Sequence, residues 1–351
     1  MSFKKNVLYC LKYTGFFKIS KFFTKNRMHV LCYHGVSIDD EHLFNPLLFM
    51  REQTFNTRME YLKKERFNVI SLNDACNYIE NMRIPSNSVV ITFDDGWYHT
   101  FAKSIPVVQK YSFPAIIYIT SYFSMKKVSV LNVVVRYLTW KAQKNNFNPK
   151  VCFCNNGDNV SVKDENGRLC QDNVLNYIES LQTLPERTAA VMNYAEYLGF
   201  DGKGILEKKV FKLMDDEDIR QASMACVDIQ LHTYRHRFPA DDLSELFEEV
   251  TNNRKHLEPL VNKRLVHLCY PSGEYSLNTL EELTRLDIKS AVTCEPGLAS
   301  SKTNLLAIPR FLDGENISQI EFEAELSGLL EILRNIRSTI KYISRSFGFG
   351  S

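Results

Sequence analysis

A short run of apolar, mostly β-branched residues from Ser88 to Phe93 ends abruptly at two carboxylates, Asp94 and Asp95, followed by Gly96. Such a run is typical of a parallel strand that is covered on both faces. In α/β folds, the chemistry gathers at the carboxyl ends of strands of this kind. The run therefore predicts an α/β protein with a site at this aspartate pair.

Among the other Asp-Asp pairs of the chain, 215–216 and 241–242 lie in polar surroundings just before helix-like segments. Aspartate is a preferred N-cap residue because its side chain accepts hydrogen bonds from the first free N–H groups of a helix. We therefore expect these two pairs to be caps or solvated charge.

Strand-like and helix-like segments alternate along most of the chain. We expect strands at 28–35, 67–71, 88–93, 114–120, 227–231, 265–270, 290–293 and 305–311, and helices at 51–65, 72–82, 97–110, 241–258 and 276–287. This alternation predicts a parallel sheet, either open or closed into a barrel.

Residues 123–213 interrupt this alternation. They contain a polar middle at 145–167 and helix-like segments at 171–182 and 185–198. Insertions at the active face of a barrel commonly shape the substrate pocket, and a loop-rich elaboration without a direct role is the alternative.

Two histidines, His232 and His236, follow the predicted strand 227–231. A lone His-x-x-x-His pattern also occurs on ordinary solvated helix faces. Joined to an aspartate at the end of another parallel strand, it forms a His, His, carboxylate set that leaves positions for water and substrate, as in catalytic zinc sites. Of two neighbouring carboxylates, one can bind the metal while the other takes a proton from the metal-activated water.

Two further strand ends carry polar groups. His34 ends the first predicted strand, which in a closed barrel lies beside the last strand, so it is a candidate for the same mouth as well as for a structural role. The segment 268–275 turns at Pro271 and Gly273, where a backbone N–H could stabilise an oxyanion; an ordinary turn explains the segment equally well.

Taken together, five motifs resemble the polysaccharide deacetylases, the family four carbohydrate esterases. They are Tyr33-His34, Thr92–Gly96, His232–His236, Tyr270–Gly273 and Ile308–Phe311. The resemblance covers about residues 28–312 apart from the insertion. It implies a distorted (β/α) barrel that removes N-acetyl groups from amino sugars with a divalent metal.

The resemblance also implies roles for individual residues. Asp94 would be the base, and the metal ligands would be Asp95, His232 and His236. The backbone N–H of Ser272, in the motif with Tyr270 and Pro271, would hold the oxyanion. Thr233 would brace the histidine loop.

The chain departs from the best-known branch of this family at two points. Cys269 stands where that branch has an arginine that orients the base, and residues 291–297 lack the late Leu-x-His motif. Both losses resemble a rearranged branch with an N-terminal Tyr-His motif. That analogy makes His34 the acid and Arg310 the candidate for the missing arginine.

Both ends of the chain are basic and amphipathic. Residues 1–38 contain seven basic residues and no acidic one, and residues after Glu331 are again free of acid. Segments 1–27 and 326–351, flanking a catalytic barrel at 28–325, could lie on an anionic membrane surface or pack on the domain. Nine scattered cysteines and the lack of a bilayer-spanning apolar run of about 20 residues favour a cytoplasmic protein, peripheral at the inner membrane face.

We therefore predict a hydrolase with a divalent metal, Zn²⁺ before Co²⁺ or Ni²⁺, that acts on an N-acetylated glycan or lipid-linked sugar made during surface-polysaccharide assembly. Nothing in the sequence indicates a nucleic-acid partner. Two alternatives stay open: a deformylase of a lipid-linked amino sugar, and a catalytically silent carbohydrate-binding barrel.

Overall fold

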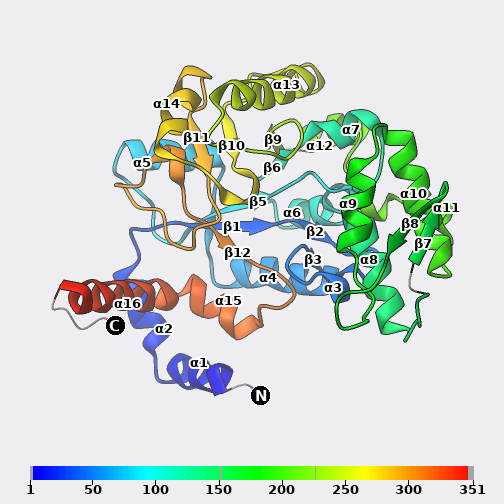
Figure 1. The fold of residues 1–351 in the computed structure, drawn as a ribbon. Helices are drawn as coiled ribbons and strands as arrows, with labels where there is room; N and C mark the ends of the chain where they lie inside the picture. The colour runs from blue at the N-terminus through cyan, green and yellow to red at the C-terminus, as the bar shows by residue number, and fades with distance from the viewer. Residues whose placement is uncertain (1–2, 151, 226, 347–351) are drawn as a thin grey trace.

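A parallel sheet forms the centre of the molecule (Figure 1). The computed structural model describes residues 3–150, 152–225 and 227–346. Within them the strands follow the order β11-β10-β9-β6-β5-β1-β12, with β4 added to β5. Their bounds are β1 His29–Tyr33, β4 Asn68–Val69, β5 Ser88–Phe93, β6 Ala115–Ile119, β9 Val227–Leu231, β10 His267–Cys269, β11 Ser290–Val292 and β12 Phe311–Leu312.

The segment 308–312 joins the two edges of this sheet. Ile308 forms a parallel bridge with Val292 of β11, and β12 pairs with β1 through Leu31 and Cys32. The sheet therefore curls round on itself, which confirms the predicted distorted (β/α) barrel.

Side chains alternate between the two faces of the sheet, as the geometry of a strand requires. Leu31, Ile91 and Ile117 belong to the large apolar cluster shared with the surrounding helices. Their neighbours Val30 and Val90 belong to a second cluster that also contains residues of α5. All six residues of β5 are buried, as predicted for a strand covered on both faces.

Helices follow most strands. They are α4 Glu52–Lys64, α5 Leu72–Glu80, α6 Ile105–Lys110, α12 Asp216–Met224, α13 Leu243–Val261, α14 Leu277–Arg285 and α15 Gln319–Leu326. Asp215 caps α12 and Asp242 caps α13, each accepting hydrogen bonds from two backbone N–H groups. The prediction that these two pairs serve as caps is thus confirmed.

Two predicted elements differ in detail. Residues 305–311 do not form one strand: Leu305–Ala307 is a 3₁₀ turn, which the side chain of Asn304 caps by accepting a hydrogen bond from the Leu306 N–H. Residues 97–110 are not one regular α-helix: a π-helical turn, Thr100–Ser104, precedes α6.

The insertion has a hydrophobic cluster of its own. The helix α7 Ser121–Lys126 leads into it. The insertion contains α8 Leu131–Lys144, α9 Asp172–Ser180, α10 Leu184–Tyr197, α11 Gly202–Glu207 and an antiparallel hairpin, β7 Cys152–Asn155 with β8 Asp158–Ser161. Asn156 and Gly157 turn the hairpin with φ of 49° and 93°, the positive angles that a two-residue hairpin turn favours. The polar composition of 145–167 did not predict this hairpin.

The described parts of the two basic segments are helical and lie near each other (Figure 1). They form α1 Phe3–Tyr13, α2 Phe16–Phe23 and α16 Leu329–Ser346. Leu8 and Phe17 pack with Ile320 and Ala324 of α15. None of the described helices is long and apolar enough to cross a bilayer.

Candidate metal and catalytic centre

Asp94 lies just beyond β5, buried at the end of the sheet. Its backbone N–H donates to the carbonyl of Tyr33, which continues the pairing of β5 with β1. Arg310 donates to both carboxylate oxygens, Nη1 to Oδ1 at 2.7 Å and Nη2 to Oδ2 at 2.7 Å. Two parallel bonds of this kind fix the plane of the carboxylate as well as its charge.

Arg310 is itself held in place. Its Nε donates to the Thr293 carbonyl at 2.8 Å, and Nη1 donates to Thr92 Oγ1 at 3.1 Å. Burial alone would raise the pKa of Asp94, but the guanidinium outweighs it and lowers that pKa well below its ordinary value. Asp94 is therefore ionised and held in one orientation.

Two thiols complete the surroundings of this carboxylate. Cys32 and Cys269 lie 3.4 and 3.3 Å from Asp94 Oδ2. Burial raises the pKa of both thiols well above its usual value, so each keeps its proton and donates it. Oδ2 thus carries three contacts, whereas the described residues give Oδ1 only its bond from Arg310. Oδ1 is the oxygen with room to receive a proton.

Asp95 turns the chain away from the sheet with a φ of 68°, followed by Gly96 at 79°. A Cβ at Gly96 would lie 3.0 Å from the Ile119 side chain, so a glycine suits this turn on two grounds. The turn presents Asp95 Oδ2 to the indole of Trp97 at 2.7 Å. Asp95 Oδ1 lies 3.2 Å from His232 Nε2 and 3.3 Å from His236 Nε2.

The orientation of His232 tests whether a metal fits here. Its Nδ1 lies 2.8 Å from the Cys269 carbonyl, which can only accept, so Nδ1 is the donor of this hydrogen bond. Nε2 points at the carboxylate of Asp95, the arrangement in which an imidazole and a carboxylate could share a cation. Backbone-oriented imidazoles are the usual ligands of divalent metals. The set Asp95, His232 and His236 therefore fits a metal ion.

Neighbouring elements brace the histidine loop. Thr233, with a φ of 62°, accepts from the Arg237 N–H through Oγ1, and its carbonyl accepts from Thr120 Oγ1. Arg235 Nε donates to Glu249 Oε1 on α13 at 2.6 Å. Asn253, also on α13, accepts from the His232 N–H. Glu249, Asn253 and Trp97 were not predicted, and no motif in the sequence marks them.

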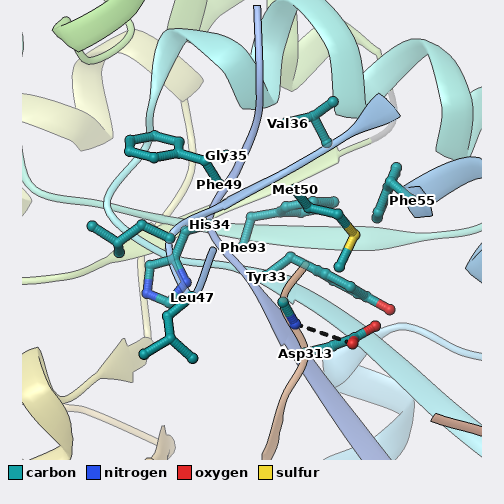
Figure 2. A pocket seen from close by; sticks show the side chains of 12 residues that line it. Tyr33, His34, Gly35, Val36, Leu47, Phe49, Met50, Phe55, Phe93 and Asp313 are labelled. Atoms are coloured by element: carbon teal, nitrogen blue, oxygen red, sulfur yellow. Dashed lines mark hydrogen bonds between the residues drawn. The ribbon is translucent and has the colours of Figure 1, made fainter. Parts of the chain in front are cut away.

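His34 follows β1 and belongs to the same cluster. One of its ring nitrogens, Cys32 Sγ and an Asp94 oxygen lie within 4.8 Å of one another. Figure 2 shows its ring turned away from that of Tyr33, beside Leu47 in a small pocket. Among the described residues its buried Nδ1 has no hydrogen-bond partner. The structure thus brings the predicted acid and base together.

Two other residue groups could hold a metal by proximity alone: Asp94, His232 and Cys269, and Cys32, His34 and Asp94. Both depend on Asp94, whose charge Arg310 already neutralises. Both also depend on a thiol, and metals bind the thiolate, which burial disfavours here. The Asp95 group is the better ligand set.

The Tyr270–Gly273 motif forms a 3₁₀ turn, Pro271–Gly273, beyond β10. The Tyr270 ring is buried and its hydroxyl donates to the Leu306 carbonyl at 2.7 Å, and Pro271 is buried too. Ser272 is exposed with a φ of 58°. Because Ser272 is exposed, its backbone N–H remains available for the predicted oxyanion role. The buried ring of Tyr270 packs in the core.

Comparison with known proteins agrees with this geometry. Residues 187–291, which include the histidine loop and the 3₁₀ turn, match the family model named polysaccharide deacetylase. The fold is similar to deacetylase PplD of Streptococcus pyogenes (TM-score 0.56, 17% identity, 88% of this chain and 98% of that chain). It is also similar to IcaB from Ammonifex degensii (TM-score 0.53, 14% identity, 86% and 97%) and to a de-N-acetylase from Aggregatibacter actinomycetemcomitans (TM-score 0.52, 13% identity, 85% and 98%).

At these identities the likeness to solved structures is one of fold. No curated protein matches the chain by sequence. Residues 187–291 therefore match a polysaccharide deacetylase model, and the fold of the chain is similar to that of solved deacetylases.

Proposed function

We propose that the chain is a metal-dependent hydrolase that removes the N-acetyl group from an amino sugar of a polysaccharide or lipid-linked glycan precursor. The observation that carries the proposal is that two adjacent carboxylates have different partners. Asp94 is paired with Arg310, and Asp95 faces two imidazole nitrogens at 3.2 and 3.3 Å. One carboxylate is prepared for proton transfer and the other for a cation.

Asp95, His232 and His236 would hold the metal, for which Zn²⁺ is the leading candidate. Such an ion supplies Lewis acidity, which polarises the amide carbonyl and makes a water molecule easier to deprotonate. Asp94 Oδ1 takes the proton of the attacking water, and Arg310 keeps that carboxylate in place. The Ser272 N–H donates to the oxygen that becomes negative, and His34 protonates the departing amine.

Acetate release from a panel of free and lipid-linked N-acetyl sugars tests this function. Activity is expected to vanish with a chelator and to return with zinc or cobalt, and Asp94→Asn should cost about 10²–10⁴-fold in kcat. Full activity of Asp94→Asn would contradict the role of Asp94 as the base. Formate release from N-formyl sugars in place of acetate would favour the deformylase, and glycan binding without turnover by the metal-loaded protein would favour a silent module.

A further inference from the structure

The described part of the chain exposes an unusual number of large apolar side chains on α1, α2 and α16. Among the residues whose side chains the structure describes, twenty large hydrophobic residues are exposed, and ten of them belong to these three helices. They are Phe3, Val7, Tyr13, Phe16, Ile19, Phe22, Phe23, Leu333, Ile336 and Ile340. Scattered single residues of this kind need no explanation, but a concentration on neighbouring helices marks an interaction surface.

Helix α2 has two apolar stripes rather than one. Phe17 and Ser20 face the protein and are buried. Phe16, Ile19 and Phe23 recur at the same helical spacing on another side and are 47%, 51% and 72% exposed. One stripe accounts for docking on the domain, and the second remains open.

Helix α16 repeats this arrangement. Leu333, Ile336 and Ile340 follow at helical spacing with exposures of 47%, 50% and 61%. Ile336 and Ile340 also line a shallow groove with Ile332, Asn335 and Thr339. Because α2 contacts α16 in the fold, the open stripes belong to one region of the surface.

Ion pairs attach this region to the domain, and several basic residues in it remain without an acidic partner among the described residues. Lys4 pairs with Glu321 at 2.7 Å, Lys12 with Glu323, and Arg27 with Glu331 at 2.9 Å. Among the described residues, Lys5, Lys18, Lys25 and Arg337 form no ion pair; α1 and α2 contain no acid, and the sole acid of α16, Glu331, is buried and paired. The surplus charge surrounding the apolar stripes is therefore positive.

We infer that α1, α2 and α16 form a docking surface for an anionic lipid bilayer. Exposed aromatic and aliphatic side chains would enter the headgroup boundary, and the unpaired lysines and arginine would meet the lipid phosphates. Pairing with a second copy is less suitable, because a twofold contact would bring two basic surfaces together. The inference does not depend on the proposed chemistry, since the surface contains no residue of the metal and catalytic centre.

Co-sedimentation of the full chain with vesicles tests this inference. Wild type should bind phosphatidylglycerol-containing vesicles and should bind pure phosphatidylcholine much more weakly, with an affinity that falls as salt rises. Phe22→Ser/Phe23→Ser should lower the partition coefficient at least about tenfold. Lys18→Glu/Lys25→Glu should have a comparable effect on the anionic vesicles alone.

Phe247→Ser is the matched control, because Phe247 is 50% exposed on α13, outside this surface. Asp94→Asn should bind like wild type, so a failure of the catalytic proposal leaves this test intact. Equal binding by wild type and both double variants would overturn the inference. So would a wild-type dimer that ignores vesicles and becomes monomeric in Phe22→Ser/Phe23→Ser, which would identify a second copy as the occupant.

Discussion

Arg310 donates a hydrogen bond of 2.7 Å to each oxygen of Asp94, although the two residues lie 216 positions apart in the chain. Both side chains are buried. Cys269 Sγ, at the position where the best-known deacetylase branch has its arginine, lies 3.2 Å from Arg310 Nη2. The guanidinium thus reaches the carboxylate from the segment that closes the barrel instead of from β10.

Loss of Arg310 should cost stability as well as activity. Arg310→Met leaves a buried carboxylate without its partner, and breaking such a pair typically costs about 3–5 kcal/mol. Urea unfolding measures this loss. Asp94→Asn/Arg310→Met should recover part of it because the uncompensated charge is gone. Unchanged stability of Arg310→Met would contradict the buried pair.

Moving the arginine back to β10 should restore part of the activity. Cys269 Sγ lies 3.3 Å from Asp94 Oδ2, so a longer side chain at this position starts beside the carboxylate. We expect Cys269→Arg/Arg310→Met to exceed Arg310→Met in kcat by about tenfold. Cys269→Lys in the same background is the control, since lysine carries the charge without the two-pronged geometry. Equal rates for all three variants would show that an arginine at position 269 cannot replace Arg310.

The assignment of His34 as acid predicts a dependence on the leaving group. His34→Asn should lower kcat about 10²–10⁴-fold on a sugar N-acetyl group, whose amine needs a proton to depart. On an acetyl 4-nitroanilide the loss should be much smaller, because that amine leaves readily without one. The same loss on both substrates would assign His34 to positioning.

Trp97 should influence metal affinity although it cannot bind the ion. Its indole N–H donates to Asp95 Oδ2, and removal of such a supporting bond commonly weakens metal binding about 10–100-fold. Calorimetric titration of zinc into chelator-treated Trp97→Phe measures the effect. Trp140→Phe, which alters the other tryptophan of the chain, should bind zinc like wild type.

His267 should make stability depend on pH. Burial lowers the pKa of this histidine to about 4 from an unfolded value near 6.5. Folding therefore excludes a proton between those values, so the stability present above pH 6.5 declines as pH falls toward 4. His267→Gln should reduce the slope of the unfolding free energy in this window by about 1.4 kcal/mol per pH unit. An unchanged slope in urea titrations at pH 7, 6 and 5 would contradict the buried neutral ring.

Strongly patterned elements were predictable from sequence. The strands 88–93 and 227–231 have the predicted bounds. The first is a mostly β-branched run and the second alternates apolar with polar residues, and both patterns admit few other structures. The 3₁₀ turn at Leu305–Ala307 was not predictable, because a local hydrogen bond from the Leu306 N–H to the Asn304 side chain outcompetes the apolar pattern. The hairpin of the insertion was missed although Asn156-Gly157, a preferred dipeptide of two-residue hairpin turns, marks its turn.

The site divides in the same way. Site residues at strand ends, such as Asp94, Asp95 and His232, can be recognised in the sequence because a polar or charged residue ends an apolar run. Asn253 and Glu249 act from within α13, where sequence gives no sign that a side chain supports a loop on another element. The thiol contacts of Cys32 and Cys269 depend on where β1 and β10 lie relative to the end of β5, and that is known only once the sheet order and its curvature are known.

The segment 308–312 both joins the two edges of the sheet and carries Arg310. During synthesis, the strand-end aspartates emerge more than two hundred residues before the arginine that orients one of them. A partly made or partly folded chain therefore has the ionisable groups but not their alignment. We expect hydrolytic activity only after the segment 308–312 has paired with both edges of the sheet. Turnover would then report directly on completed folding.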